Sequence, residues 1–178
     1  MNLGVYENFP VINHGIVSGL FTAPLDVVQI SVIRALHYLN SFVTSRTVNV
    51  SGKKGICEGI VGFWVGVADR SIFHPLEKTL VETLSFFAIQ GTLPSNLDFL
   101  FVVTYHYYRG AERNPLHFDY HQLRFSFNRN EFELRLFHSK GTRRMPLDEL
   151  LHYILDAVNE ELAKQSMKRL IVHSTRIL

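Results

Sequence analysis

The sequence has few of the features that are typical of secreted or membrane-inserted proteins. It has one cysteine, Cys57, which excludes an internal disulfide and a cysteine-cluster zinc site. Its richest apolar run, Gly59 to Ala68, is far shorter than the roughly 18 to 20 residues that a membrane helix needs. Residues 1–10 lack a basic segment and include Glu7, so we expect no signal peptide. These absences predict a cytoplasmic protein that is not inserted in a membrane.

Sequence motifs that are diagnostic of a particular enzymatic reaction are also missing. The segment 51–55, Ser-Gly-Lys-Lys-Gly, lacks the spacing of a phosphate-binding P-loop. The chain has no Gly-x-Ser-x-Gly nucleophile elbow and no dinucleotide fingerprint. The sequence therefore leaves open whether the protein is an enzyme, and it names no cofactor.

The composition is that of one globular domain. The chain has 178 residues, 47% of them hydrophobic, and it includes 14 phenylalanines. This length supports one compact core and is short for two independent ones. No linker or low-complexity tract divides it, so we predict a single domain over residues 1–178.

One tripeptide, Pro-Leu-acid, occurs three times, at residues 24–26, 75–77 and 146–148. Each copy precedes residues with helical apolar spacing. Proline is favoured at the first helical position, and an acid soon after it faces the positive end of the helix dipole. The pattern predicts three helices, at residues 25–42, 76–89 and 147–163.

Runs of alternating or continuous apolar residues predict the strands 11–22, 46–50, 56–67, 99–108, 123–127, 132–136 and 170–177. Residues 51–55 and 128–130 are predicted hairpin turns, and the strand at 99–108 is predicted to be central. The fold class is α/β (α+β), with three helices and a mixed, mainly antiparallel sheet of six or seven strands. The order βαββαβ followed by ββαβ predicts a ferredoxin-like first half, in which the first and third strands lie side by side.

The predicted helix 25–42 is apolar on nearly every side, since its only charges are Asp26 and Arg34. Such a helix is buried on more than one face. We expect it to form a subunit interface in a homo-oligomer, with burial inside the chain as the alternative.

The leading hypothesis for function is a site for a small anionic metabolite where strands pass into helices. If the three helix N-termini meet at one edge of the sheet, their N–H groups and nearby arginines can bind phosphate or carboxylate. His74 is the candidate acid or base, because its ordinary pKa lies near neutrality. The candidate ligand-binding residues are Thr22, Asp69, Arg70, Ser139, Lys140, Arg143 and Arg144, with Ser71 and Thr142 beside them.

A second hypothesis is a metal site. On a strand, His117, Asp119 and His121 would point to one side, and two imidazoles with a carboxylate suit iron or zinc. His138 or His173 could supply a further ligand. The alternative is that Asp119 serves in a turn before the strand.

A third hypothesis is binding of RNA or single-stranded nucleic acid. The net charge of the chain is only +2, but residues 121–146 hold six basic residues and two acidic ones. Arginines around an aromatic sheet face bind single strands by stacking and by phosphate neutralisation. The residues for this role are Arg124, Arg135, Lys140, Arg143 and Arg144, with tyrosines such as Tyr105 and Tyr120 nearby. A non-catalytic assembly protein is the remaining alternative.

Overall fold

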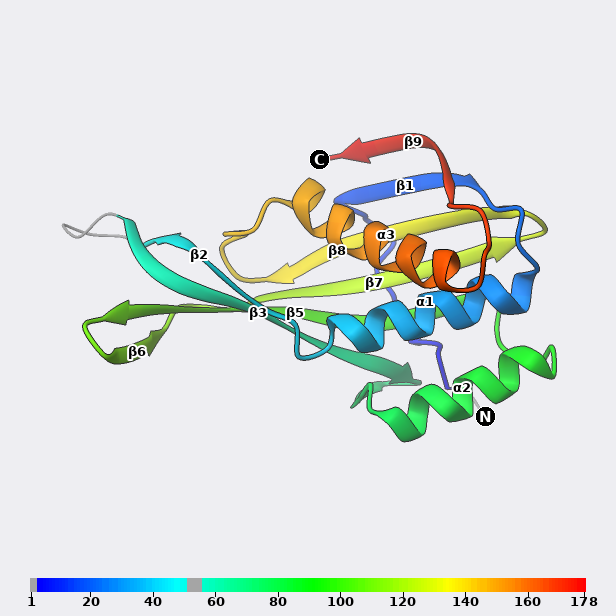
Figure 1. Ribbon diagram of the computed structural model, residues 1–178, viewed down its shortest axis with the longest axis horizontal. Coiled ribbons are helices and arrows are strands. Elements are labelled where there is room, and N and C mark those ends of the chain that lie inside the picture. The colour runs from blue at the N-terminus through cyan, green and yellow to red at the C-terminus, as the bar shows by residue number, and fades with distance from the viewer. Residues whose placement is uncertain (1–2, 51–55) are drawn as a thin grey trace.

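The computed structural model describes residues 3–50 and 56–178, and the hairpin turn predicted at 51–55 lies outside them. Three helices pack on a nine-stranded sheet (Figure 1), so the predicted fold class is confirmed. The helices are α1 (Leu25–Leu39), α2 (Lys78–Ile89) and α3 (Leu147–Lys164). The strands are β1 (Gly15–Leu20), β2 (Val43–Asn49), β3 (Ile56–Asp69), β4 (Ile72–Pro75), β5 (Asn96–Arg109), β6 (Glu112–Pro115), β7 (Asp119–Asn128), β8 (Glu131–Lys140) and β9 (Ile171–Ile177).

The strand order differs from the ferredoxin-like prediction, which is wrong. The main path of the sheet is β2-β3-β5-β7-β8-β1-β9, and the short strands β4 and β6 pair with β3 and β5. Strand β1 therefore lies between β8 and β9, far from β3. Gly19 permits this placement, because an added Cβ there would clash with the carbonyl oxygen of Ile171 in β9. Neighbouring strands of this path pair antiparallel throughout.

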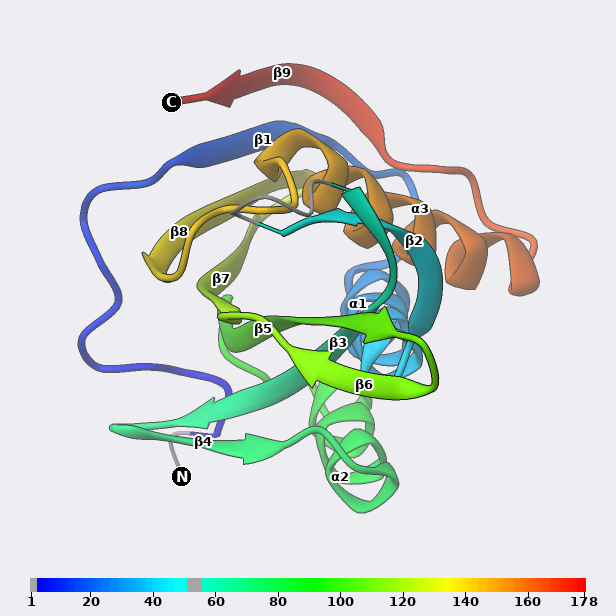
Figure 2. The ribbon, with the colours of Figure 1, turned by 90° about the vertical axis from the view of Figure 1, so that its left-hand side faces the viewer.

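All three helices cover one face of the sheet (Figure 2). The core between the layers takes alternate residues from β3, β5, β7 and β8, as the antiparallel pleat requires. Strand β5 is interior, and its Phe101, Val103 and Tyr105 are buried, so the prediction of a central strand at 99–108 is confirmed.

The Pro-Leu-acid tripeptide marks helix starts less uniformly than predicted. Pro24 and Pro146 stand immediately before the first residues of α1 and α3, in extended conformations with ψ of 146° and 145°. They are therefore N-caps, not first helical residues. Pro75 instead ends β4, and α2 begins three residues later at Lys78. Proline fixes φ but leaves ψ free, which allows both uses.

Helix α1 lies between α2 and α3 (Figure 1), and it packs against both of them and against the sheet. Burial inside the chain therefore accounts for most of its apolar residues. Tyr38 stays 60% exposed and Leu25 44% exposed on its outer side. Self-association through this helix stays a prediction.

The N-terminal segment crosses the other face of the sheet (Figure 2). It is held by Asp98, which is fully buried although its side chain points away from the helices. The Asp98 carboxylate accepts hydrogen bonds from the backbone N–H of Tyr6 at 2.8 Å and from Nε and a terminal nitrogen of Arg124 at 2.6 and 2.8 Å. The Arg124 guanidinium also lies over the ring of Phe9, 4.3 Å from its centre. One buried ion pair thus fastens this segment to the sheet.

We predict that Asp98→Ala lowers the free energy of unfolding by about 3–5 kcal/mol, because it leaves a mostly buried guanidinium without its carboxylate. Urea unfolding followed by circular dichroism measures this. The matched control is Glu133→Ala, which breaks the half-exposed pair with Arg135 and should cost less than about 1 kcal/mol. Equal losses in the two variants would contradict the assigned role of Asp98.

Candidate functional site

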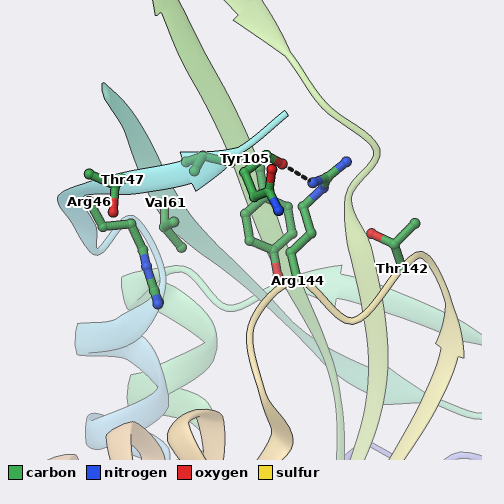
Figure 3. Close-up of a pocket in the computed structure, with 8 residues that line it drawn as sticks. Arg46, Thr47, Val61, Tyr105, Thr142 and Arg144 are labelled. Atoms are coloured by element: carbon green, nitrogen blue, oxygen red, sulfur yellow. Dashed lines mark hydrogen bonds between the residues drawn. The ribbon is translucent and has the colours of Figure 1, made fainter. Parts of the chain in front are cut away.

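A cavity with cationic side chains lies where the sheet extends past the helix layer, between β2, β5 and the loop 141–146 that precedes α3 (Figure 3). Its volume is about 550 Å³, within the range of small-molecule sites. The lining residues that matter here are Arg46, Thr47, Val61, Tyr105, Thr142 and Arg144.

Two arginines set the charge of this cavity. Arg46 pairs with Glu149 of α3, with 2.6 Å between the nearest nitrogen and oxygen, and both side chains are about one-third exposed. Arg144 reaches across to β2 and donates to the carbonyl oxygen of Asn49 at 2.6 Å (Figure 3). Its Nε is buried and has no hydrogen-bond partner among the described residues. Two guanidinium groups against one carboxylate leave the cavity net positive, which favours an anion.

The loop that carries Arg144 is fixed by a buried carboxylate, that of Asp119. The backbone N–H groups of Arg143 and Arg144 donate to its two oxygens at 2.7 and 2.9 Å. The hydroxyl of Tyr105 donates to it at 2.5 Å and accepts the N–H of Met145 at 2.8 Å. His138 Nε2 lies 3.2 Å from the same carboxylate. The backbone donors ahead of α3 are thus already satisfied by an anion, and that anion belongs to the protein.

The protonation states of this cluster follow from its contacts. Burial by itself would raise the pKa of Asp119, but the hydrogen bonds from Tyr105, Arg143, His138 and Arg144 outweigh it and hold that pKa below its ordinary value. Burial and the neighbouring Asp119 raise the pKa of Tyr105 well above its ordinary value. At neutral pH Asp119 is therefore ionised and Tyr105 protonated. Four donors occupy the carboxylate, which makes Asp119 an anchor rather than a base.

His121 lies beside this cluster, fully buried on the helix side of β7. Its Nδ1 is 3.2 Å from the carbonyl oxygen of Phe101, and its Nε2 has no partner among the described residues. Burial lowers the pKa of His121 to about 4, so its ring is neutral at pH 7. Since the Phe101 carbonyl can only accept, the proton belongs on Nδ1.

The metal hypothesis finds no support in this geometry. His117 precedes β7 and is exposed, whereas Asp119 and His121 are buried. Within residues 3–50 and 56–178, no group of three or more His, Cys, Asp or Glu side chains is arranged to hold a metal ion. The alternation along the strand placed two of the three residues together, but the strand does not extend back to His117.

The residues of the predicted anion site do not all meet. Helices α1 and α3 start at opposite ends of the sheet. Phe21, beside Thr22, lies at the β7–β8 turn, where its backbone N–H donates to the carbonyl oxygen of Asn130. The start of α3 is held by Asp119 at the other end of that hairpin. Ser139 donates to the Tyr120 carbonyl near this second end. The predicted convergence of three helix N-termini is therefore wrong.

Asp69, Arg70 and His74 lie at the β3–β4 turn beside the N-terminal segment, where Arg70 exchanges backbone hydrogen bonds with residues 5 and 7. Asp69 lies eight positions after the cavity residue Val61 in β3, which is roughly 26 Å along a strand. His74 Nε2 is 3.7 Å from Asp69, and both side chains are partly exposed. Of the predicted ligand-binding residues, only Arg144 lines the cavity, together with its neighbour Thr142.

Sequence reasoning missed Arg46 and the cavity role of Tyr105. The pairing of Arg46 with Glu149 joins residues 103 positions apart, so no local pattern reveals it. The sequence of β2 gives no local signal for it, because its two valines, the exposed Val43 and the buried Val48, fall on opposite faces of the strand. The predicted nucleic-acid set is also divided, because Arg124 is committed to Asp98 and Arg135 is paired with Glu133.

The chain matches no protein-family model, no curated protein and no solved structure. Its function is therefore inferred from the geometry and charge of its own surfaces. No helix in residues 3–50 and 56–178 combines the length and apolar character needed to cross a membrane.

We predict that His121 makes folding stability pH-dependent. Its folded pKa of about 4 lies below its ordinary 6.5, so the folded protein binds fewer protons than the unfolded chain between these values. The free energy of unfolding should fall by up to about 3 kcal/mol as the pH drops through this window. Urea titrations at several pH values measure the fall, which His121→Phe should reduce. Substitution of the exposed His152 is the control. If the free energy of unfolding of His121→Phe depended on pH as steeply as that of the unaltered chain, the role assigned to His121 would be contradicted.

We also predict that Tyr105→Phe destabilises the loop before α3. The change removes one donor to Asp119 and the acceptor of the Met145 N–H, which should cost about 1–3 kcal/mol. Amide hydrogen exchange should quicken at Arg143 to Met145. Tyr38→Phe removes the same hydroxyl from an exposed residue and should change stability by less than about 0.5 kcal/mol. Protection of the loop amides that stays at the wild-type level would refute the anchoring role.

Proposed function

We propose that the protein binds a small anionic metabolite in the cavity between β2, β5 and the loop 141–146. The observation that carries this proposal is the pair of guanidinium groups, those of Arg46 and Arg144, that line the cavity with Glu149 as the one carboxylate paired to them among the described residues. An anion placed there can accept from the guanidinium groups of Arg144 and of Arg46 on the opposite wall. Phosphate and carboxylate are the groups that guanidinium binds bidentately.

The remaining walls suit a small polar ligand. Thr47 and Thr142 contribute hydroxyls, while Val61 gives an apolar surface. The anchoring by Asp119 supports the proposal, because a fixed loop loses little conformational entropy when a ligand binds.

The proposed activity is binding rather than catalysis. The described residues that line the cavity include no His, Cys, Asp or Glu, the usual acids, bases and nucleophiles. Tyr105 keeps its proton because of its raised pKa. His74, the acid or base predicted from the sequence, lies at the β3–β4 turn.

We predict that a thermal-shift screen of phosphorylated and carboxylated metabolites identifies compounds that raise the melting temperature, since a ligand of the folded state must stabilise it. Arg144→Ala and Arg46→Ala should each weaken binding about 10- to 150-fold, the range for a lost hydrogen bond to a charged group. Isothermal titration with the best compound measures these affinities.

Arg34→Ala is the control for this experiment, because it removes the same charge from the exposed side of α1. It should leave the affinity unchanged. A panel in which no compound shifts the melting curve would refute the proposal, and so would an equal loss of affinity in Arg34→Ala and Arg144→Ala.

A further inference from the structure

The sheet has a second face, which no helix among the described residues covers (Figure 2). The N-terminal segment lies over one end of this outer face, where Asp98 and Arg124 hold it. The other end, formed by β5, β6, β7 and β8, stays open. Its side chains alternate with buried core residues, so their direction follows from the pleat: Tyr105 points inward and His106 outward.

A stripe of five side chains crosses this open end, from Arg113 through His106, Phe118 and Tyr120 to Lys140. Arg113 lies 3.2 Å from His106 Nδ1, between its terminal nitrogen and the ring. The rings of His106 and Phe118 are 5.8 Å apart. We call this set the aromatic stripe. It has a cation at each end and three rings between them.

The far end of the aromatic stripe borders a hollow of about 510 Å³. Phe118, Tyr120 and Lys140 line it, with the Lys140 ammonium 6.0 Å from the centre of the Tyr120 ring. The hollow and the cavity proposed for a metabolite lie on opposite faces of the sheet. Thr142 borders both of them.

We propose that the aromatic stripe binds single-stranded nucleic acid. Bases stack on the partly exposed rings, and the phosphates pair with Lys140 and Arg113 at the two ends. Strands β6 and β7 lie on the same side of β5, so the stripe crosses two inter-strand spacings, about 10 Å, which accommodates a short run of bases stacked at about 3.4 Å. Burial and the adjacent Arg113 lower the pKa of His106, so its ring is uncharged at neutral pH and presents a stacking surface.

Charge and shape distinguish this partner from others. A duplex has no unstacked bases to offer the rings, so it could use only the two cations. Of the basic residues that the sequence predicted for nucleic-acid binding, only Lys140 belongs to the aromatic stripe. Arg124 and Arg135 lie on the same face, but each is paired with a carboxylate.

Fluorescence anisotropy with labelled oligo(dT) and oligo(U) of about 12 nucleotides tests the proposal, since a single-strand site covers roughly 4–16 nucleotides. The full chain should bind at about 50 mM salt and lose affinity at about 200 mM. A duplex of equal length should bind more weakly. No binding of either oligonucleotide at low salt would overturn the proposal, as would a duplex bound as tightly as the single strands.

Variants locate the site. Phe118→Ala and Tyr120→Ala should each weaken binding about 5- to 150-fold, the range for loss of one stacked base. Tyr120→Phe keeps the ring and should bind as the unaltered chain does. Lys140→Ala, at an exposed residue, should weaken binding and reduce its salt dependence without disturbing the fold.

Tyr38→Ala is the matched control, because this tyrosine is 60% exposed on the helix side of the molecule. Its affinity for both oligonucleotides should be unchanged. Melting curves show which variants fold, and Lys140→Ala tests the stripe even if an aromatic variant does not. Wild-type affinity in Tyr120→Ala and Lys140→Ala would overturn the proposal.

Discussion

The carboxylate of Asp119, buried and fully hydrogen-bonded, is the constraint on which one end of this molecule depends. It joins β7 to the loop before α3 through two backbone N–H groups, to β5 through Tyr105 and to β8 through His138. Gly141 makes the close approach possible, since its φ is +111° and an added Cβ would clash with this carboxylate. An unpaired charge at this depth would be costly, so the loop and the sheet hold each other in place.

This anchoring explains why the backbone donors before α3 are not open to a ligand, contrary to the expectation from the sequence. The donors that precede a helix do attract an anion here, but the anion is internal. The proposed ligand would therefore bind the side chains of the loop, above all that of Arg144. The same loop separates the two proposed surfaces, with Arg144 on the helix side and Lys140 on the outer face. Thr142 borders both hollows, so their shapes depend on one fixed segment.

A second buried carboxylate, Asp98, organises the opposite end of the outer face. By binding both Arg124 and the N–H of Tyr6, it keeps the N-terminal segment over that end and leaves the aromatic stripe open. The two aspartates thus have comparable roles, since each fixes an irregular segment to a strand of the sheet. Neither is recognisable from local sequence, because their partners are mostly far along the chain.

The sequence by itself determined the three helices, nearly all of the long strands, the interior position of β5 and the α+β fold class. These follow from apolar periodicity and from proline and turn residues, which act over a few neighbouring positions. Only the tertiary structure decided that β1 lies between β8 and β9, that the helices start at different ends of the sheet, and that Arg46 faces Arg144 across a cavity. Strand pairing and long-range ion pairs depend on which surfaces meet. The free energy of those contacts cannot be deduced from the residue spacing within any one segment.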